Sequence, residues 1–342
     1  MFAKLRSALL LGALLLGCLA AGTACAAQGK LEKLRVHGAS LEGNLQGNDA
    51  TRDVWVYTPP GYEESGKRYP VIYFLHGYAV TADVYVNEVL KIPAATDEAM
   101  SKGAPGVIIV MPDAFTRFGG SWYSSSPTIG DWEAFITRDL VGYIDSHYRT
   151  IAKRGGRGLA GHSMGGYGTW RIGMKYPRVF GAIYAMSSAI LLQAPTAEAV
   201  KAQLARLAAD PNLRSQPKSS TDGVESQASA WAPDPQNPPW YFDLPFDAAG
   251  NAVPAVADKW TANSVMTMLE QHVKALKSLR AIMMDVGDQD SLEAGNRQFS
   301  DALAKAGVKH GFEVYEGTHG NRVGARFIAN VLPFFARHLD RK

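Results

Sequence analysis

The feature that most constrains this 342-residue chain is the stretch GLAGHSMGGYG at residues 158–168. It places Ser163 between glycines, directly after an apolar run and directly before a segment with helical spacing. At the positions that flank so sharp a strand-to-helix turn, a side chain would collide with neighbouring backbone, so the turn requires glycine there. The match of residues 161–165 to G-x-S-x-G therefore predicts a turn that presents the Ser163 hydroxyl as a nucleophile.

Strand-like and helix-like segments alternate along the rest of the chain. Short β-rich apolar runs predict strands at 52–60, 69–77, 106–113, 157–162, 181–187, 279–287 and 310–317. Helical spacing predicts helices at 131–148, 163–177, 197–209, 291–307 and 321–339, the last of them bent by Pro333. This alternation predicts an α/β fold with a mostly parallel sheet and helices on both faces.

One region breaks the alternation. Residues 190–265 contain the helix predicted at 197–209, then a Ser/Pro/Asp-rich stretch, then WAPDPQNPPWYFDLPF at 231–246. The prolines of 231–246 exclude a central strand or helix, while its aromatic residues argue against disorder. We therefore predict an ordered, cap-like insertion within a single domain that spans residues 28–342.

Residues 1–27 have the pattern of a secretory signal peptide. Lys4 and Arg6 precede an apolar stretch, and small residues follow at a candidate cleavage site. Both cysteines, Cys18 and Cys25, lie in this leader, so we expect a mature protein without thiols that is secreted or periplasmic. LLGC, which ends at Cys18, also loosely resembles a lipoprotein box, which leaves open a lipid anchor at that residue.

Charge and hydropathy exclude several classes of partner. Loss of Lys4 and Arg6 with the leader takes the 35 basic residues to 33 against 32 acidic ones, and no basic stripe suits nucleic acid. No apolar run reaches the ~20 residues of a membrane-spanning helix. No Cys/His cluster has metal-ligand spacing, so we expect no metal and no other cofactor. Nothing in the sequence indicates an oligomeric state.

A nucleophilic serine needs a base that takes its proton and an acid that orients the base. In the fold that carries this turn, both follow the serine at strand ends. Among the later histidines, His319 follows a predicted strand in a glycine-flanked loop, so it is the predicted base. The acid is Asp288 or Asp290, and the residues alone do not decide, because Asp290 and Glu293 also match a helix capping box.

From the predicted strand at 69–77 through GHSMGGYG, VGDQDSL and EGTHG to the last helix, the chain resembles the putative-esterase (esterase D-like) family of α/β-hydrolases. That family includes S-formylglutathione hydrolases, feruloyl and acetylxylan esterases, and mycolyltransferases. The resemblance implies an α/β-hydrolase fold with an eight-stranded sheet. It also selects Asp290, three residues after Gly287, as the acid, with Asp288 in reserve.

The resemblance extends to the walls of the site. It implies an oxyanion hole formed by the backbone N–H groups of Tyr78 and Met164. GGSWYSSSP at 119–127 and GDWEAF at 130–135 are similar to segments that border the family's cleft. These segments and the insertion supply aromatic residues that either bind substrate or pack: Trp122, Tyr123, Trp132 and Trp240.

Taken together, these features lead us to expect an exported serine carboxylesterase. It would act through an acyl-enzyme on a small-molecule or carbohydrate ester of the short-chain acyl, acylated-sugar or feruloyl type. Two alternatives stay open: an acyltransferase that moves the acyl group to a sugar hydroxyl, and a non-catalytic binding protein on the same scaffold. Hydrolysis and transfer would use the same triad and differ only in the acceptor pocket.

Overall fold

The computed structural model describes residues 28–190, 195–218 and 223–342. The predicted signal peptide and the lipoprotein box at Cys18 therefore lie outside the described residues, as do 191–194 and 219–222 of the predicted insertion. Within the described ranges, no helix combines the length and the apolar character needed to cross a membrane.

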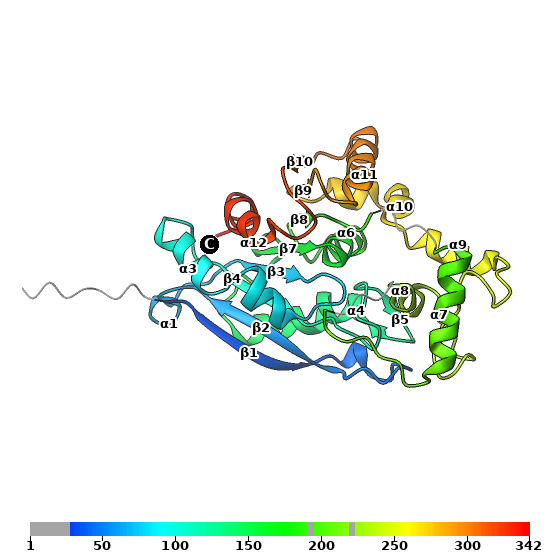
Figure 1. The fold of residues 1–342 in the computed structure, drawn as a ribbon. Helices are drawn as coiled ribbons and strands as arrows, with labels where there is room; N and C mark the ends of the chain where they lie inside the picture. The colour runs from blue at the N-terminus through cyan, green and yellow to red at the C-terminus, as the bar shows by residue number, and fades with distance from the viewer. Residues whose placement is uncertain (1–27, 191–194, 219–222) are drawn as a thin grey trace, which may run out of the picture.

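An eight-stranded sheet runs through the molecule in the order β1-β2-β4-β3-β7-β8-β9-β10 (Figure 1). Its strands are β1 Lys30–His37, β2 Thr51–Thr58, β3 Val71–Leu75, β4 Ile108–Pro112, β7 Arg157–His162, β8 Ala182–Met186, β9 Ala281–Gly287 and β10 Gly311–Tyr315. Strand β2 is antiparallel to both β1 and β4, and the other neighbours in this sheet are parallel. The predicted mostly parallel α/β sheet is thus confirmed.

Strand β1 is the one member of this sheet for which the sequence pattern predicted no range. It lies at the sheet edge, and among its residues only Val36 is buried. An edge strand that faces solvent carries little of the apolar signal that marks buried strands. A separate two-stranded ladder pairs β5 Ser125–Ser126 with β6 Gly130–Asp131.

The helices lie on both faces of the large sheet, as predicted. In chain order they are α1 Tyr62–Ser65, α2 Ala82–Val84, α3 Ala94–Ser101, α4 Trp132–Ala134, α5 Val141–His147, α6 Met164–Lys175, α7 Ala197–Ala209, α8 Val224–Trp231, α9 Pro254–Ala262, α10 Val265–Lys277, α11 Glu293–Lys305, α12 Val323–Arg326 and α13 Leu332–His338. Three π-helical segments are present among the described residues: Tyr85–Val89 continues α2, Phe135–Leu140 joins α4 to α5, and Phe327–Val331 joins α12 to α13. The last of these precedes Pro333, which lacks the N–H that a regular helix would need there.

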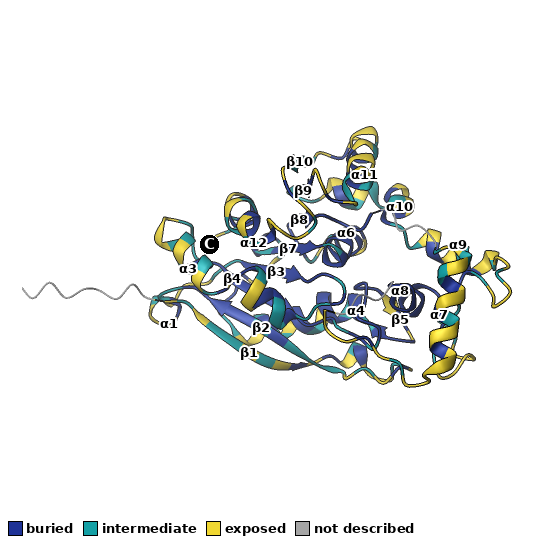
Figure 2. Cartoon of the chain, viewed as in Figure 1, coloured by how far each residue is buried: buried dark blue, intermediate teal, exposed yellow. Residues whose placement is uncertain are grey.

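The buried side chains form two clusters, one on each face of the sheet. Along β3, Tyr73 and Leu75 belong to one cluster and Ile72 and Phe74 to the other, which is the two-residue alternation of a strand covered on both sides. Helices α5, α6, α10 and α11 contribute to the first cluster, and α12 and α13 to the second. Figure 2 shows the central strands β3, β7 and β8 in the dark blue of buried residues, whereas the edge strand β1 is largely exposed or intermediate.

The predicted insertion packs at one end of the molecule, where α7, α8 and α9 lie together (Figure 1). Helix α7 has the bounds predicted for it. The guanidinium group of Arg117 donates hydrogen bonds to the carbonyl oxygens of Pro211, Leu213 and Pro239 and lies over the ring of Trp240. One side chain that precedes α4 therefore holds two separate parts of the insertion.

Candidate active site

Ser163 lies in the turn between the end of β7 and the start of α6. Its φ of 59° and ψ of −114° are strained for a residue with a side chain. A Cβ atom on Gly161 would overlap the backbone of Gly165, and one on Gly165 would overlap the carbonyl of Leu75 at the end of β3. The glycines are therefore required by close backbone approach, which is the reason that the sequence predicted.

The structure brings His319 and Asp290 to this serine. His319 Nε2 lies 2.9 Å from Ser163 Oγ, and His319 Nδ1 lies 2.8 Å from Asp290 Oδ2. The three residues follow β7, β9 and β10, whose carboxyl ends meet at one edge of the sheet. Because a carboxylate only accepts hydrogen bonds, Nδ1 carries the proton and Nε2 is left to accept the serine proton.

Asp290 is buried, and both of its carboxylate oxygens are bonded. Oδ1 accepts the backbone N–H of Leu292 at 2.9 Å while Oδ2 faces His319. Burial opposes ionisation, but these hydrogen bonds outweigh it and lower the pKa of Asp290, so the carboxylate stays charged. The alternative role of Asp290 in a capping box is absent, because α11 begins at Glu293 without a side-chain cap.

Asp288, the reserve acid, is not brought to His319. Its side chain is exposed, and Oδ1 accepts the backbone N–H of Gly317 at 3.0 Å. That bond ties the turn after β9 to the loop after β10. Asp288 therefore supports the loop that carries the histidine instead of orienting the imidazole.

The two backbone N–H groups expected to form an oxyanion hole belong to segments beside the nucleophile. Met164 is the first residue of α6, where backbone N–H groups have no partner within the helix. A Cβ atom on Gly77 would lie 3.5 Å from Ser163 Cβ, so the peptide between Gly77 and Tyr78 lies next to the serine. The positive end of the α6 dipole adds to the attraction for an anion here.

His76 shapes the loop that leads to Tyr78. Its Nε2 accepts the backbone N–H of Ala114 at 2.8 Å, so Nδ1 carries the proton and donates to the Gly77 carbonyl at 2.8 Å. Burial lowers the pKa of His76, which keeps the ring neutral. Both nitrogens are used within the protein, so His76 holds backbone instead of contacting substrate.

Of the four predicted aromatic residues, Trp122 and Tyr123 pack against the loop at residues 76–78. The Trp122 ring stacks on Tyr78 with centroids 6.2 Å apart, and its Nε1 donates to Ser226 Oγ of the insertion at 2.9 Å. The Tyr123 hydroxyl donates to the His76 carbonyl at 3.1 Å. Both residues have positive φ and are buried; Trp122 joins Tyr78 to the insertion, and Tyr123 holds the backbone of His76.

The other two predicted aromatic residues lie elsewhere. Trp132 is fully buried in the core, and its Nε1 donates to the Ile129 carbonyl, so it packs instead of binding substrate. Trp240 lies against Arg117 and Phe118 and lines a cavity of about 360 Å³ within the insertion. None of the three residues Ser163, Asp290 and His319 lines that cavity.

Sequence reasoning missed two residues that touch this site. The His162 side chain contacts the backbone of His319, and Tyr85 contacts His162. The one available signal for His162 was its place beside Ser163 in the motif, whereas Tyr85 lies in a segment without any motif.

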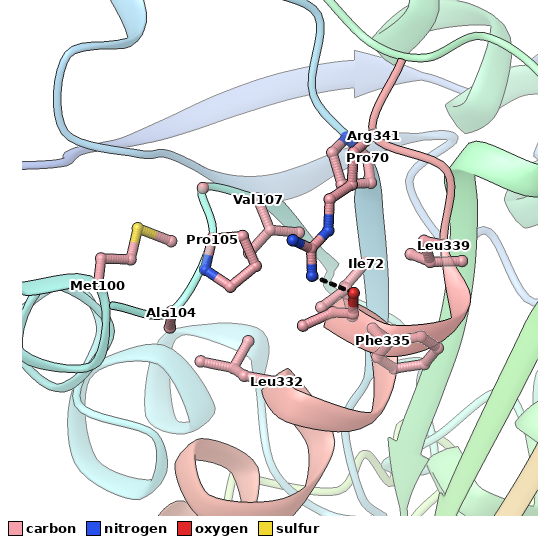
Figure 3. Close-up of a pocket in the computed structure, with 12 residues that line it drawn as sticks. Pro70, Ile72, Met100, Ala104, Pro105, Val107, Leu332, Phe335, Leu339 and Arg341 are labelled. Carbon is pink, nitrogen blue, oxygen red and sulfur yellow. Dashed lines mark hydrogen bonds between the residues drawn. The ribbon is translucent and has the colours of Figure 1, made fainter. Parts of the chain in front are cut away.

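An apolar pocket at the other end of β3 is shown in Figure 3. Its lining includes Ile72, Met100, Leu332 and Phe335, and Arg341 crosses it to donate to the Ala336 carbonyl. Its free volume of about 20 Å³ has room for about one water molecule, so it is no substrate site.

Across the part of the chain that the structure describes, no group of three or more His, Cys, Asp or Glu residues is placed to hold a metal.

Comparison with known proteins also indicates an esterase family. Residues 48–333 match the model of a family described as putative esterase. The chain is 38% identical over 127 residues to Esterase Rv1288 of Mycobacterium tuberculosis, which covers 35% of this chain and 25% of that protein. It is 24% identical over 206 residues to an acetyl esterase of Caldicellulosiruptor saccharolyticus, covering 60% of this chain and 64% of that one. The chain thus spans about a quarter of the length of the mycobacterial relative.

Solved structures extend the likeness over most of the chain. A ferulic acid esterase superposes with a TM-score of 0.65 at 25% identity and covers 92% of this chain and 100% of its own. An S-formylglutathione hydrolase from Staphylococcus aureus superposes with a TM-score of 0.59 at 15% identity, covering 90% of this chain and 99% of its own. The second likeness is one of fold alone.

Proposed function

Because this chain belongs to the putative-esterase family, we propose that it is a serine carboxylesterase that hydrolyses carboxylic esters through an acyl-enzyme. The observation that carries the proposal is the hydrogen-bonded series from Ser163 Oγ through His319 to the Asp290 carboxylate. In such a series, the acid holds the imidazole in one orientation and tautomer, and the imidazole activates the hydroxyl.

In the proposed first step, Ser163 Oγ attacks the ester carbonyl carbon while His319 Nε2 takes the hydroxyl proton. The carbonyl oxygen becomes an oxyanion, which the N–H groups of Tyr78 and Met164 stabilise. Loss of one such donor typically costs about 2.7–4 kcal/mol of transition-state stabilisation. The Asp290 carboxylate stabilises the imidazolium that forms beside it.

In the second step, the tetrahedral intermediate collapses and the bond to the alcohol oxygen breaks. The imidazolium of His319 gives its proton to that oxygen, so the alcohol leaves and the acyl group stays on Ser163. Water then repeats the cycle, with His319 as base, and releases the carboxylic acid.

For the substrate, we propose esters met outside the cytoplasm: acetyl, feruloyl or other short acyl groups on sugars. The signal-peptide pattern at 1–27 supports export, and the names of the ferulic acid esterase and the acetyl esterase support these acyl groups. N-terminal sequencing of the protein recovered outside the cytoplasm would test export. A start at residue 27 or 28 is expected, and retention of the full leader inside the cell would contradict it.

Hydrolysis of p-nitrophenyl acetate, butyrate and octanoate and of methyl ferulate by the mature protein tests the activity. Ser163→Ala should lower kcat by about 10⁴-fold or more, because it removes the nucleophile. Ser146→Ala, a change at an exposed serine of α5, is the matched control and should leave kcat unchanged. Turnover that persists in the Ser163 variant, or wild-type rates no higher than those of that variant on every ester, would contradict the proposal.

A further inference from the structure

His162 directly precedes the nucleophile, yet its ring points toward the base. Its Nε2 lies 2.7 Å from the backbone carbonyl oxygen of His319, and the centroids of the two rings are 4.7 Å apart. Its Nδ1 lies 2.6 Å from the hydroxyl of Tyr85, in the π-helical segment after α2. Both nitrogens of His162 are therefore used inside the protein.

The chemistry of these partners assigns the protons. A carbonyl oxygen only accepts, so His162 Nε2 carries the hydrogen and donates it to His319. Burial, with a smaller contribution from the adjacent His319, lowers the pKa of His162 to about 3, so the ring is neutral and its Nδ1 accepts from Tyr85. Burial also raises the pKa of Tyr85, which keeps its hydroxyl protonated as the donor.

Tyr85 extends the hydrogen-bonded pair of His162 and His319 toward the loop at Gly77 and Tyr78. A Cβ atom on Gly77 would lie 2.6 Å from the Tyr85 hydroxyl oxygen, so this hydroxyl lies against the loop that leads to Tyr78. Tyr85 and His162 together thus contact three segments: the loop of the expected oxyanion hole, the turn at Ser163 and the loop that carries His319.

The loop of His319 is exposed around the histidine itself. The His319 side chain is 43% exposed, Thr318 and Gly320 on either side are exposed, and a Cβ atom on Gly320 would meet nothing within 4 Å. The partly buried hydrogen bond from His162 ties the backbone of this loop at the residue whose Nε2 must meet Ser163.

We propose that His162, oriented by Tyr85, is a positioning residue that fixes the backbone of His319 relative to Ser163. The inference rests on the proposed serine mechanism and deepens it. His162 takes no part in proton transfer to substrate, because neither of its nitrogens is free to do so. Its effect is on the distance between His319 Nε2 and the serine hydroxyl.

Three variants separate this role from a general effect on packing. His162→Leu removes both hydrogen bonds and should lower kcat by about 10²-fold with KM within about 3-fold of wild type, because small displacements of reacting groups cost rate. His162→Gln keeps an N–H donor near the His319 carbonyl and should recover most of kcat. Tyr85→Phe removes a single hydroxyl and should cause an intermediate loss of about 3- to 10-fold.

A fluorophosphonate probe supplies a readout that needs no ester substrate. Ser163 Oγ forms a bond to phosphorus, fluoride leaves, and His319 takes the serine proton, so the labelling rate should fall across the variants in the order of kcat. His310→Gln, in which a histidine before β10 loses its bond to Ser300, is the matched control and should label at the wild-type rate. Thermal unfolding and titration of labelled sites give the folded fraction of each variant.

The proposal is overturned if folded His162→Leu keeps wild-type kcat, if the Leu and Gln variants lose equal activity, or if the losses follow the folded fraction. If the Leu variant fails to fold, the Gln and Tyr85→Phe variants decide by the same criteria. A wild type that takes up the probe but hydrolyses no ester would contradict the proposed esterase activity while leaving the positioning test in place.

Discussion

His319 Nε2 lies 2.9 Å from Ser163 Oγ although 156 residues separate the two in the chain. The serine follows β7 and the histidine follows β10, and strands β8 and β9 lie between them in the sheet. Parallel strands place all of their carboxyl ends at one edge, so the loops that follow them gather there. The register of the sheet, and not local sequence, determines this distance.

The choice between the two candidate acids can be tested directly. Asp290→Asn should lower kcat by about 10³- to 10⁴-fold, because an amide favours the wrong imidazole tautomer and carries no charge to stabilise the imidazolium. Asp288→Asn keeps an oxygen for the Gly317 N–H and should change kcat by less than about 3-fold. Steady-state hydrolysis of p-nitrophenyl butyrate measures both, and similar losses in the two variants would contradict the assignment.

The strained turn at Ser163 should tolerate no added methyl group. Gly165→Ala would force a Cβ atom into the carbonyl of Leu75 and should lower the free energy of unfolding by about 3 kcal/mol or more. Gly142→Ala, on an exposed position of α5 with nothing within 4 Å, should raise it by about 0.5–1 kcal/mol. Urea denaturation compares the two, and a harmless Gly165 variant would show that the turn can relax.

Arg117 should hold the insertion in place. Arg117→Ala removes hydrogen bonds to carbonyl oxygens in two parts of it and should lower the free energy of unfolding by about 1.5–3 kcal/mol. Limited proteolysis should then cut the variant within 195–265 sooner than wild type. Arg138→Ala, which breaks an exposed ion pair with Asp139, should cost less than about 1 kcal/mol and leave the cleavage pattern unchanged. If the Arg117 variant resisted proteolysis as well as wild type does, contacts other than those of Arg117 would be enough to hold the insertion in place.

Stability should fall as the solution becomes acidic, with a contribution from His162. Its pKa is lowered to about 3 in the folded protein, while an unfolded histidine titrates near ~6.5. Between these values the unfolded chain binds more protons, so stability is lost as pH falls through this window, by up to ~1.4 kcal/mol per pH unit for this group. Burial lowers the pKa of His76 as well, which acts in the same direction.

Urea denaturation of wild type and of His162→Gln at pH 7, 6, 5 and 4 measures that contribution. The variant lacks the group, so its free energy of unfolding should decline less steeply between pH 6.5 and 4. The other titratable groups are common to both proteins, so their contributions cancel when the two free energies of unfolding are subtracted. Parallel curves would show that His162 is charged in the folded state or leaves the core before the protein unfolds.

Local sequence was sufficient for most of the secondary structure. Strands β3, β4 and β8 are buried at every residue, and their unbroken apolar runs predicted them because no polar side chain can be placed there without cost. Strand β1 escaped prediction because an exposed edge strand needs no such run. Helices α3, α8, α9 and α10 also escaped prediction. The buried face of α8 includes Ser226 and Ser229, which are bonded to Trp122 and Ser126, so a partly polar face gives no clear apolar period.

The aromatic residues are a case in which the sequence does not predict whether a side chain lies at the site or in the core. Trp122 and Trp132 lie ten positions apart in similar surroundings, and both were candidates for the substrate wall. One stacks on Tyr78 beside the serine and the other is enclosed in the core. An indole ring carries the same apolar surface in either place, so its own chemistry does not distinguish them.

Neighbours along the chain were enough to predict the alternation of strands and helices, the glycine-flanked turn at Ser163 and the position of His319 after a strand. The folded structure was needed to see that Asp290 faces His319 while Asp288 bonds Gly317, and that His162 bonds the backbone of the histidine loop. Those contacts join segments from separate strand ends. Their geometry depends on how the parallel strands align in the sheet, which no local pattern encodes.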